Sequence, residues 1–298
     1  MKRIIVTGAA GRLGAALVRH FAAESPVFAL GRSDADLGNP GALRARIEAE
    51  EFSALINCAA LTNVDYCESH PEQARMVNAE SVGVLARVCA DKGARLVQVS
   101  TDYVFAGDQP GLVGEEAPAE PRSVYGRTKL AGEQAALAFA GNCVARVSWV
   151  FGPDRPSFLD MAIRRALSEE RVEAIGDKYS SPSYTRDLGQ WIGALLDSRV
   201  PGGVVHLCNA GVCSWQAYAQ FALDELRRAG VALRTATVIP TRLCDMSSFV
   251  AERPIHTAMD TARFTGWTGI TPRAWTEAVS EYLREHVIPG LHADSGKE

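Results

Sequence analysis

The sequence lacks three features that would place it in other classes of protein. It has seven cysteines but no Cys-x-x-Cys pair and no Cys/His spacing typical of a zinc site, so we predict no metal. It has a formal net charge of −4 and no long basic run, which argues against nucleic acid as a partner. Its apolar runs are short, so we expect no segment that spans a membrane.

The N-terminal segment also lacks the pattern of a signal peptide, because an apolar strand begins as early as Ile4. Several cysteines lie inside apolar strands, as expected for reduced, buried thiols, and we therefore predict a cytoplasmic protein. The chain has 298 residues, of which 47% are hydrophobic and 22% charged. These values suit a globular protein of one large domain or two closely joined ones.

What the sequence does contain is a regular alternation of strands and helices. Helical patterns, the longest at 72–91, separate five short apolar runs, at residues 3–7, 27–32, 54–57, 94–100 and 143–151. This alternation predicts an α/β fold with a doubly wound, parallel, Rossmann-type sheet.

Proline-punctuated, shorter elements follow this first half of the chain. We expect residues 1–150 to form a dinucleotide-binding domain and residues 151–298 to form mainly a smaller substrate-binding part. The helix predicted at 185–197 and the strand at 204–208 should rejoin the sheet of the first domain.

A glycine-rich turn connects the first strand to the first helix. Gly8, Gly11 and Gly14 form a GxxGxxG pattern that also contains Arg12 and Leu13. Such glycines let the backbone turn tightly and approach a pyrophosphate at the N-terminus of the helix. The pattern therefore predicts a dinucleotide site, with a plain tight turn as the alternative.

The end of the second strand bears on which dinucleotide is bound. An acidic residue there would bind the ribose hydroxyls of NAD, but the strand ends in Gly31 and Arg32. Arg32, together with Arg12, could hold a 2′-phosphate, so we expect NADP(H), with NAD(H) as the alternative. A solvated loop arginine is the simpler interpretation of Arg32. Asp36 and Leu37 are candidates for flanking the adenine.

Small or hydroxyl-bearing residues follow the next two strands. Ala59, Ala60 and Thr62 lie after the third strand and leave room for a ligand, and Thr101 ends the fourth. The carboxyl ends of parallel strands meet at one edge of a sheet, where open α/β sheets bind their ligands. We expect these residues to line the same site as the glycine turn.

Tyr125 and Lys129 are four residues apart in a predicted helix, and therefore share one face of it. A tyrosine beside an ammonium group is easier to ionise, so it can exchange a proton with a carbonyl oxygen. The spacing alone is equally typical of an ordinary surface helix. Its place beside three strand ends and loops that converge on one edge favours a catalytic pair.

These segments together resemble the extended short-chain dehydrogenases/reductases, and among them the chain is similar to the dTDP-4-dehydrorhamnose reductase family. The resemblance covers nearly the whole chain and rests on TGAAGRLG (7–14), INCAALTNVD (56–65), VNAE (77–80), VSTDYVF (99–105), SVYGRTKLAGE (123–133), RVSWVFG (146–152), SPSYTRDL (181–188), RP (253–254) and MDT (259–261). It implies reduction of the 4-keto group of a nucleotide-linked deoxysugar by NAD(P)H.

The resemblance also implies a role for each residue of the site. Tyr125 would donate the proton to the sugar oxygen, Lys129 would lower the pKa of the tyrosine and bind the nicotinamide ribose, and Thr101 would hold the reacting oxygen. Asp102 and Tyr103 would touch the sugar. Trp149 would stack on the sugar or form a wall of the pocket, with a core position as an equal alternative.

Three alternatives and two departures accompany this interpretation. Related dehydratases carry Thr-Asp-Glu where this chain has Tyr103, so elimination is disfavoured, whereas an epimerase stays open. A non-catalytic, NADP-binding regulatory subunit of the methionine adenosyltransferase type is the third alternative. The chain departs from the reductase pattern at 155–158 and at 177–183, where Lys178 adds a positive charge. Because of these departures, the sequence does not identify the particular sugar or nucleotide base. It does not determine the oligomeric state either, for which a homodimer is the assembly we consider.

Overall fold

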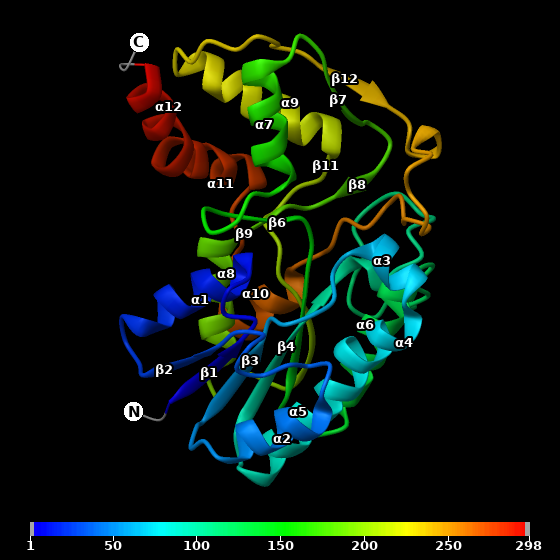
Figure 1. Cartoon of the computed structure of the whole chain (residues 1–298), viewed down its shortest axis with the longest axis vertical. Coiled ribbons are helices and arrows are strands. Elements are labelled where there is room, and N and C mark those ends of the chain that lie inside the picture. The colour runs from blue at the N-terminus through cyan, green and yellow to red at the C-terminus, as the bar shows by residue number, and fades with distance from the viewer. Residues whose placement is uncertain (1–2, 296–298) are drawn as a thin grey trace.

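The computed structural model describes residues 3–295 and is built around one six-stranded parallel sheet (Figure 1). The strands, in spatial order, are β10 (Gly203–His206), β5 (Cys143–Val147), β4 (Arg95–Thr101), β3 (Ala54–Asn57), β1 (Ile4–Thr7) and β2 (Val27–Leu30). Every neighbouring pair is parallel, as short apolar strands joined by helices require. The predicted fold class is therefore confirmed.

Helices cover both faces of this sheet. One face carries α1 (Arg12–Ala22), α8 (Thr185–Leu195) and α10 (Ala262–Thr268), which pack their apolar side chains against β1, β5 and β10. The other face carries α2 (Pro40–Glu48), α5 (Ser81–Asp91) and α6 (Val124–Leu137). Because both faces are covered, most strand residues are apolar and buried, whereas the edge strand β2 is partly exposed.

The helix predicted over residues 72–91 is interrupted. The structure has α4 (Pro71–Arg75), a π-helical segment (Met76–Glu80) and then α5. In the π segment, buried Asn78 binds the backbone N–H of Leu61 at 2.8 Å and its carbonyl oxygen at 3.0 Å. A single π turn inserts one extra residue without ending the helix, which lets Asn78 reach the loop after β3.

The upper part of Figure 1 is a second, smaller layer of helices and strand pairs. Its helices are α7 (Phe158–Ser168), α9 (Trp215–Arg228), α11 (Trp275–Tyr282) and α12 (Ile288–Ser295). Its strand pairs are β7 (Val172–Ile175) with β12 (Val238–Thr241), β8 (Tyr179–Ser180) with β11 (Cys213–Ser214), and β6 (Val150–Phe151) with β9 (Ser183–Tyr184). Its core contains a cluster of aromatic side chains in mutual contact, among them Phe151, Tyr184 and Tyr218.

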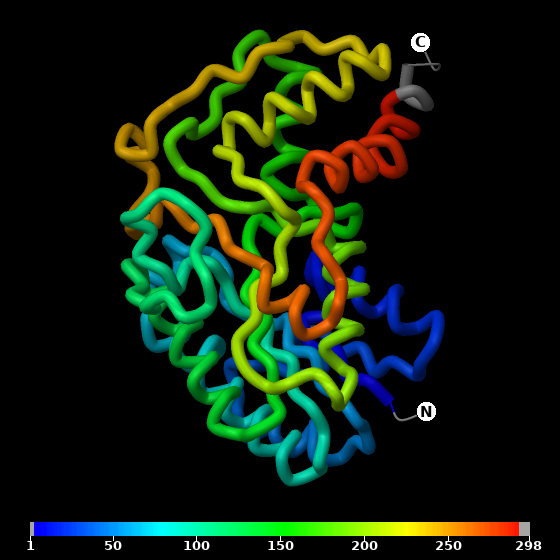
Figure 2. Tube along the Cα trace, turned by 180° about the vertical axis from the view of Figure 1, so that it is seen from behind, coloured from blue at the N-terminus to red at the C-terminus, as the bar shows by residue number. Residues whose placement is uncertain are grey.

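The chain crosses between the two parts several times after residue 150, as the trace in Figure 2 shows. It leaves the sheet for β6 and α7, returns for α8 and β10, leaves again for α9, and returns for α10. The remaining helix, α3 (Val64–Ser69), lies after β3. Within residues 3–295, no helix has the length and apolar content needed to cross a membrane.

Candidate active site

A cavity of about 1370 Å³ lies along the carboxyl ends of β1, β2, β3, β4 and β5 and extends beneath the second part. It is larger than the roughly 300–1,000 Å³ of most small-molecule sites, so it has room for two ligands. It also spans the gap between β1 and β3, where the order of the strands reverses and where open α/β sheets bind ligands.

The glycine turn forms one end of this cavity. Gly8 has a φ of +64°, and a Cβ atom there would lie 2.8 Å from the backbone nitrogen of Ala59, so only glycine fits. Gly11, Leu13 and Gly14 also line the cavity. Helix α1 begins at Arg12 with no acidic side chain in its first turn, which leaves its N-terminal N–H groups available to an anion. This arrangement fits a dinucleotide pyrophosphate.

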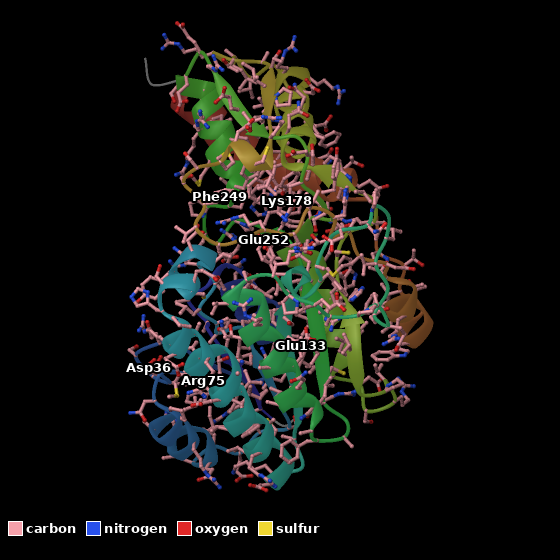
Figure 3. All side chains as sticks on the ribbon, turned by 90° about the vertical axis from the view of Figure 1, so that its right-hand side faces the viewer. Asp36, Arg75, Glu133, Lys178, Phe249 and Glu252 are labelled. Atoms are coloured by element: carbon pink, nitrogen blue, oxygen red, sulfur yellow. The ribbon has the colours of Figure 1, made fainter. Side chains whose placement is uncertain are left out.

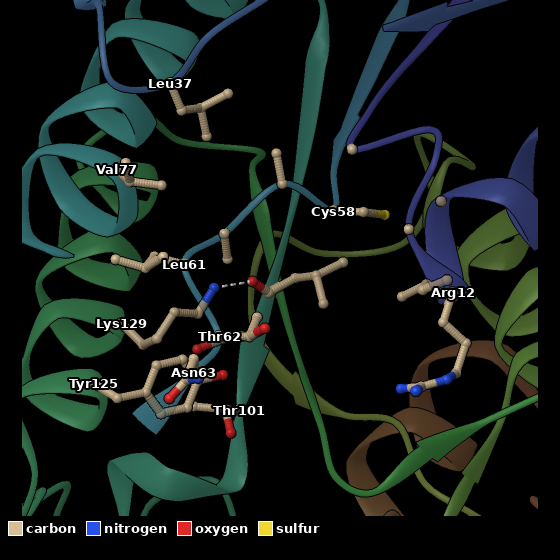
Figure 4. A pocket seen from close by; sticks show the side chains of 18 of the residues that line it. Arg12, Leu37, Cys58, Leu61, Thr62, Asn63, Val77, Thr101, Tyr125 and Lys129 are labelled. Carbon is tan, nitrogen blue, oxygen red and sulfur yellow. Dashed lines mark hydrogen bonds between the residues drawn. The ribbon is translucent and has the colours of Figure 1, made fainter. Parts of the chain in front are cut away.

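The residues at the end of β2 lie at the rim of the cavity. Arg32, Asp36 and Leu37 all line it. The Arg32 side chain is 84% exposed and lies 3.9 Å from the Asp36 carboxylate, so it is free to turn toward a phosphate. Arg12 instead donates to the carbonyl oxygens of Arg155, at 3.0 Å, and of Pro156. Figure 4 shows Arg12 on the opposite side of the cavity from Leu37. Among the residues that the structure describes, Arg32 is therefore the cation that lines the cavity at the end of β2.

The loop after β3 is positioned by buried amides. Ala59, Ala60 and Thr62 line the cavity, as their place at a strand end predicts. Inside the sheet, Thr7 donates to Asn57 at 2.5 Å, and Asn57 donates to Gln98 at 2.7 Å. These buried hydrogen bonds can all form only when β1, β3 and β4 are in register. They therefore fix the relative positions of the strand ends that carry the site.

The catalytic candidates are brought together by α6 and β4. Ser123 caps α6 by accepting from the N–H of Gly126 at 3.2 Å, and the first turn of the helix then carries Tyr125 toward the cavity. Tyr125 and Lys129 are buried, 8% and 4% exposed, and Thr101 lies at the end of the neighbouring strand. Figure 4 shows the three side chains on one side of the cavity.

The expected effect of Lys129 on the pKa of Tyr125 is not seen. Burial raises the pKa of Tyr125, and a hydrogen bond with Thr101 offsets this only in part. The Lys129 ammonium donates to the carbonyl oxygen of Val99 at 2.7 Å, away from the phenol. Burial also lowers the pKa of Lys129 to about 8, with Glu133 opposing the shift. In this geometry the Tyr125 phenol is protonated at neutral pH.

Asp102 is held by protein hydroxyl groups. Its carboxylate accepts from Thr101 at 3.0 Å, from Ser180 at 3.1 Å and from Thr257 at 2.5 Å. Only 2% of the residue is exposed, and it reaches the cavity at its wall. Tyr103 lies beside it, with its ring edge-on to Tyr125 at a centroid distance of 5.6 Å.

Lys178 does not add a charge to the cavity, contrary to what its place in the sequence suggested. It is fully buried where the two parts of the molecule meet (Figure 3), and it is absent from the cavity lining among the described residues. Its ammonium lies 5.0 Å from the centre of the Tyr103 ring and donates to the carbonyl oxygen of Pro254. Burial lowers the pKa of Lys178 to about 8, and the nearby Asp102 carboxylate opposes the shift.

Trp149 has an unusual backbone. Among the residues described, it is the one non-glycine residue with a positive φ, 42°. Its ring lines the cavity and packs 5.7 Å from Trp215, while its buried indole N–H has no partner in the described part of the chain. Strained backbone and an unpaired buried donor are typical of functional positions. The structure therefore places Trp149 in the cavity wall as well as in the aromatic core.

Two ion pairs that no local sequence pattern predicts connect elements around the site. The Asp65 carboxylate on α3 accepts from Arg253 at 2.6 Å and 3.0 Å and from the N–H groups of Val250 and Ala251, both at 2.9 Å. These bonds fasten a segment of the second part to the first, and they hold the pKa of Asp65 near 2. The partners lie almost two hundred residues apart, and no local pattern links them.

The second unassigned pair is buried between α6 and β5. Glu133 and Arg146 form two hydrogen bonds, at 2.6 Å and 2.9 Å, and Ser100 donates to Glu133 at 2.6 Å. Tyr125, Lys129 and Glu133 share one face of α6, because they are spaced by four residues. The i, i+4 spacing could have indicated Glu133 from the sequence, but not its partner on β5.

The parallel sheet, the glycine turn and the Thr101–Tyr125–Lys129 group at one edge define the class of extended short-chain dehydrogenases/reductases. A family model described as the RmlD substrate binding domain matches residues 1–288. The chain belongs to this family.

Relatives and solved structures agree with this assignment. The dTDP-4-dehydrorhamnose reductase of Streptomyces griseus is 36% identical over 94% of this chain and 92% of its own. The dTDP-4-keto-6-deoxy-D-glucose reductase of Streptomyces niveus is 34% identical over 98% of each chain. A structure of dTDP-4-dehydrorhamnose reductase from Bacillus anthracis in complex with NADP superimposes with a TM-score of 0.87, at 28% identity, over 95% of this chain and 99% of that one.

Proposed function

We propose that this protein is an NAD(P)H-dependent oxidoreductase that reduces the 4-keto group of a nucleotide-linked deoxysugar. The observation that carries the proposal is the meeting of Thr101, Tyr125 and Lys129 in one cavity that also contains a glycine turn. The names of the relatives, which are reductases of dTDP-linked keto sugars, support the substrate class.

The cofactor would lie between the glycine turn and Lys129. We propose that Gly8, Gly11 and Gly14, with Arg12 and Leu13, hold its pyrophosphate end, and that Asp36 and Leu37 flank the adenine. Ala59, Ala60 and Thr62 would contact the central part of the cofactor, between its adenine and its nicotinamide. Lys129 would bind the nicotinamide ribose. The exposed Arg32 guanidinium could bind the 2′-phosphate of NADP(H), which favours this cofactor, with NAD(H) as the alternative. The nicotinamide, when bound, supplies a hydride for C4 of the sugar.

Tyr125 would then donate the proton that the reduced oxygen requires. Its raised pKa keeps the phenol protonated at neutral pH, so the proton to be donated is present. A positioned acid of this kind typically contributes roughly 10²–10⁴-fold to the rate. Thr101 would hold the reacting oxygen in line, once its hydroxyl turns from Asp102. The deprotonated phenol that follows would be stabilised by the Lys129 ammonium after that group leaves Val99.

The sugar would lie against Asp102, Tyr103 and Trp149. We propose that residues 1–150, with 185–197 and 204–208, form the dinucleotide-binding domain and that the rest of 151–298 mainly binds the substrate. The relatives' substrates support a dTDP sugar, and the buried position of Lys178 removes one reason to expect a different one. A cytoplasmic location and a homodimer complete the proposal.

The test is the oxidation of NADPH, followed at its absorbance, when purified protein receives a dTDP-4-keto-6-deoxy sugar. Tyr125→Phe should lower kcat by about 10²-fold or more and leave the Kd of NADPH unchanged, because only the proton donor is removed. Tyr179→Phe is the matched control, because its ring stacks on His256 and does not line the cavity in the described chain.

Other outcomes would favour the alternatives. Tight NADPH binding without turnover on a panel of keto-sugar nucleotides would support a regulatory subunit. Interconversion of two sugars without net consumption of NADPH would support an epimerase. For the cofactor, Arg32→Ala should reduce the preference for NADPH over NADH, and an unchanged ratio would remove Arg32 from the site.

A further inference from the structure

The segment 152–157, between β6 and α7, is fastened to the glycine turn by two arginines that cross. Arg12 donates through Nε to the carbonyl oxygen of Arg155 at 3.0 Å and through Nη2 to that of Pro156. In return, Arg155 donates through Nε to the carbonyl oxygen of Ala10, in the glycine turn, at 2.5 Å. The side chain of Arg155 is thereby brought from the second part of the molecule to the pyrophosphate end of the cavity, which it lines.

The two guanidinium groups both lie at the glycine turn and interact electrostatically. Neither Arg12 nor Arg155 forms an ion pair with a carboxylate among residues 3–295, and their protein acceptors are neutral carbonyl oxygens. Arg19, about two turns further along α1, does form such a pair, with Asp154. Burial lowers the pKa of Arg12, the nearby Asp160 carboxylate opposes this shift, and the charge on Arg155 makes a smaller contribution in the same direction as burial. An anion between the two arginines would remove this repulsion.

We propose that Arg155 is a cofactor-binding residue whose guanidinium contacts the pyrophosphate of the dinucleotide, opposite the N-terminus of α1. This inference rests on the function proposed above. Guanidinium groups bind phosphate through two parallel N–H bonds, and both Nη atoms of Arg155 lack partners in the described structure. The contact would link the cofactor to the segment that leads from Trp149 to α7, and so to the substrate wall.

The experiment measures binding of ADP-ribose, which has the pyrophosphate but neither the nicotinamide nor the 2′-phosphate, by calorimetry in the absence of any sugar substrate. Arg155→Ala should weaken binding by about tenfold, as the loss of one charge-assisted phosphate contact implies. Arg155→Lys should recover part of this loss, because it keeps the charge. Arg164→Ala is the matched control, because Arg164 is exposed on α7 and outside the described cavity lining.

Arg19→Ala distinguishes the loss of the Arg155 guanidinium from a weaker attachment of segment 152–157 to α1. This change removes the ion pair with Asp154 and leaves Arg155 in place, so ADP-ribose affinity should stay within about twofold of the wild type. The inference is overturned if Arg155→Ala binds as well as the wild type, or if Arg19→Ala weakens binding as much as Arg155→Ala does. A wild-type protein that binds neither NADPH nor ADP-ribose would overturn the proposed function as well.

Discussion

Removing the charge of Glu133 should destabilise this protein more than any surface substitution, although Glu133 does not line the described cavity. Glu133 and Arg146 are 2% and 4% exposed, and Nη1 of Arg146 already lacks a partner in the described chain. Glu133→Gln keeps the shape of the side chain but leaves the whole guanidinium buried without an anion. Breaking a buried pair on one side costs about 3–5 kcal/mol, and we expect a loss of that size in the free energy of unfolding.

The assay is urea denaturation followed by circular dichroism, with the slope of the transition compared between variants. The double variant Glu133→Leu/Arg146→Leu removes both charges and should cost less than Glu133→Gln, because no unpaired charge remains. Glu169→Gln is the matched control: it breaks an exposed i, i+4 pair with Arg165 on α7 and should cost at most about 0.5 kcal/mol. A loss below about 1 kcal/mol for Glu133→Gln would refute the reasoning.

Three further predictions concern other contacts. The pKa of Lys129 is lowered by burial from 10.5 to about 8, so the unfolded chain binds the Lys129 proton more tightly than the folded protein does. The free energy of unfolding of the wild type should therefore rise between about pH 8 and pH 10.5 relative to that of Lys129→Met. Curves of unfolding free energy against pH that run parallel for the two proteins would contradict this. Gly132→Ala should cost about 1–3 kcal/mol in urea denaturation, because its Cβ would lie 2.1 Å from a backbone oxygen of the π-helical segment, whereas Gly83→Ala, with 3.7 Å of space, should not destabilise. Asp65→Asn should lower the free energy of unfolding by about 1–2 kcal/mol at pH 7, because it weakens the bonds to Arg253. Since the pKa of Asp65 is depressed to about 2, this difference between variant and wild type should be complete above about pH 4 and vanish as the pH falls through 2. Thermal unfolding at several pH values would measure it.

The sequence by itself determined the sheet and the edge at which the site lies. Strand–helix alternation leaves little choice but a parallel sheet, and the carboxyl ends of parallel strands must meet. The glycine turn and the spacing of Tyr125 and Lys129 are local, so period and residue type suffice to find them. For the same reason, Ala59 and Thr62 could be assigned to the cavity from their position after a strand.

Only the tertiary structure decided how charges are distributed around that edge. Lys178 reads in the sequence as an additional cation for the substrate, but folding buries it beneath the Tyr103 ring. Lys129 is bonded to Val99, so burial rather than the ammonium sets the pKa of Tyr125. Arg155 reaches the glycine turn from a different part of the chain. Burial and pairing between distant segments depend on the packed chain as a whole, and a one-dimensional pattern does not contain them.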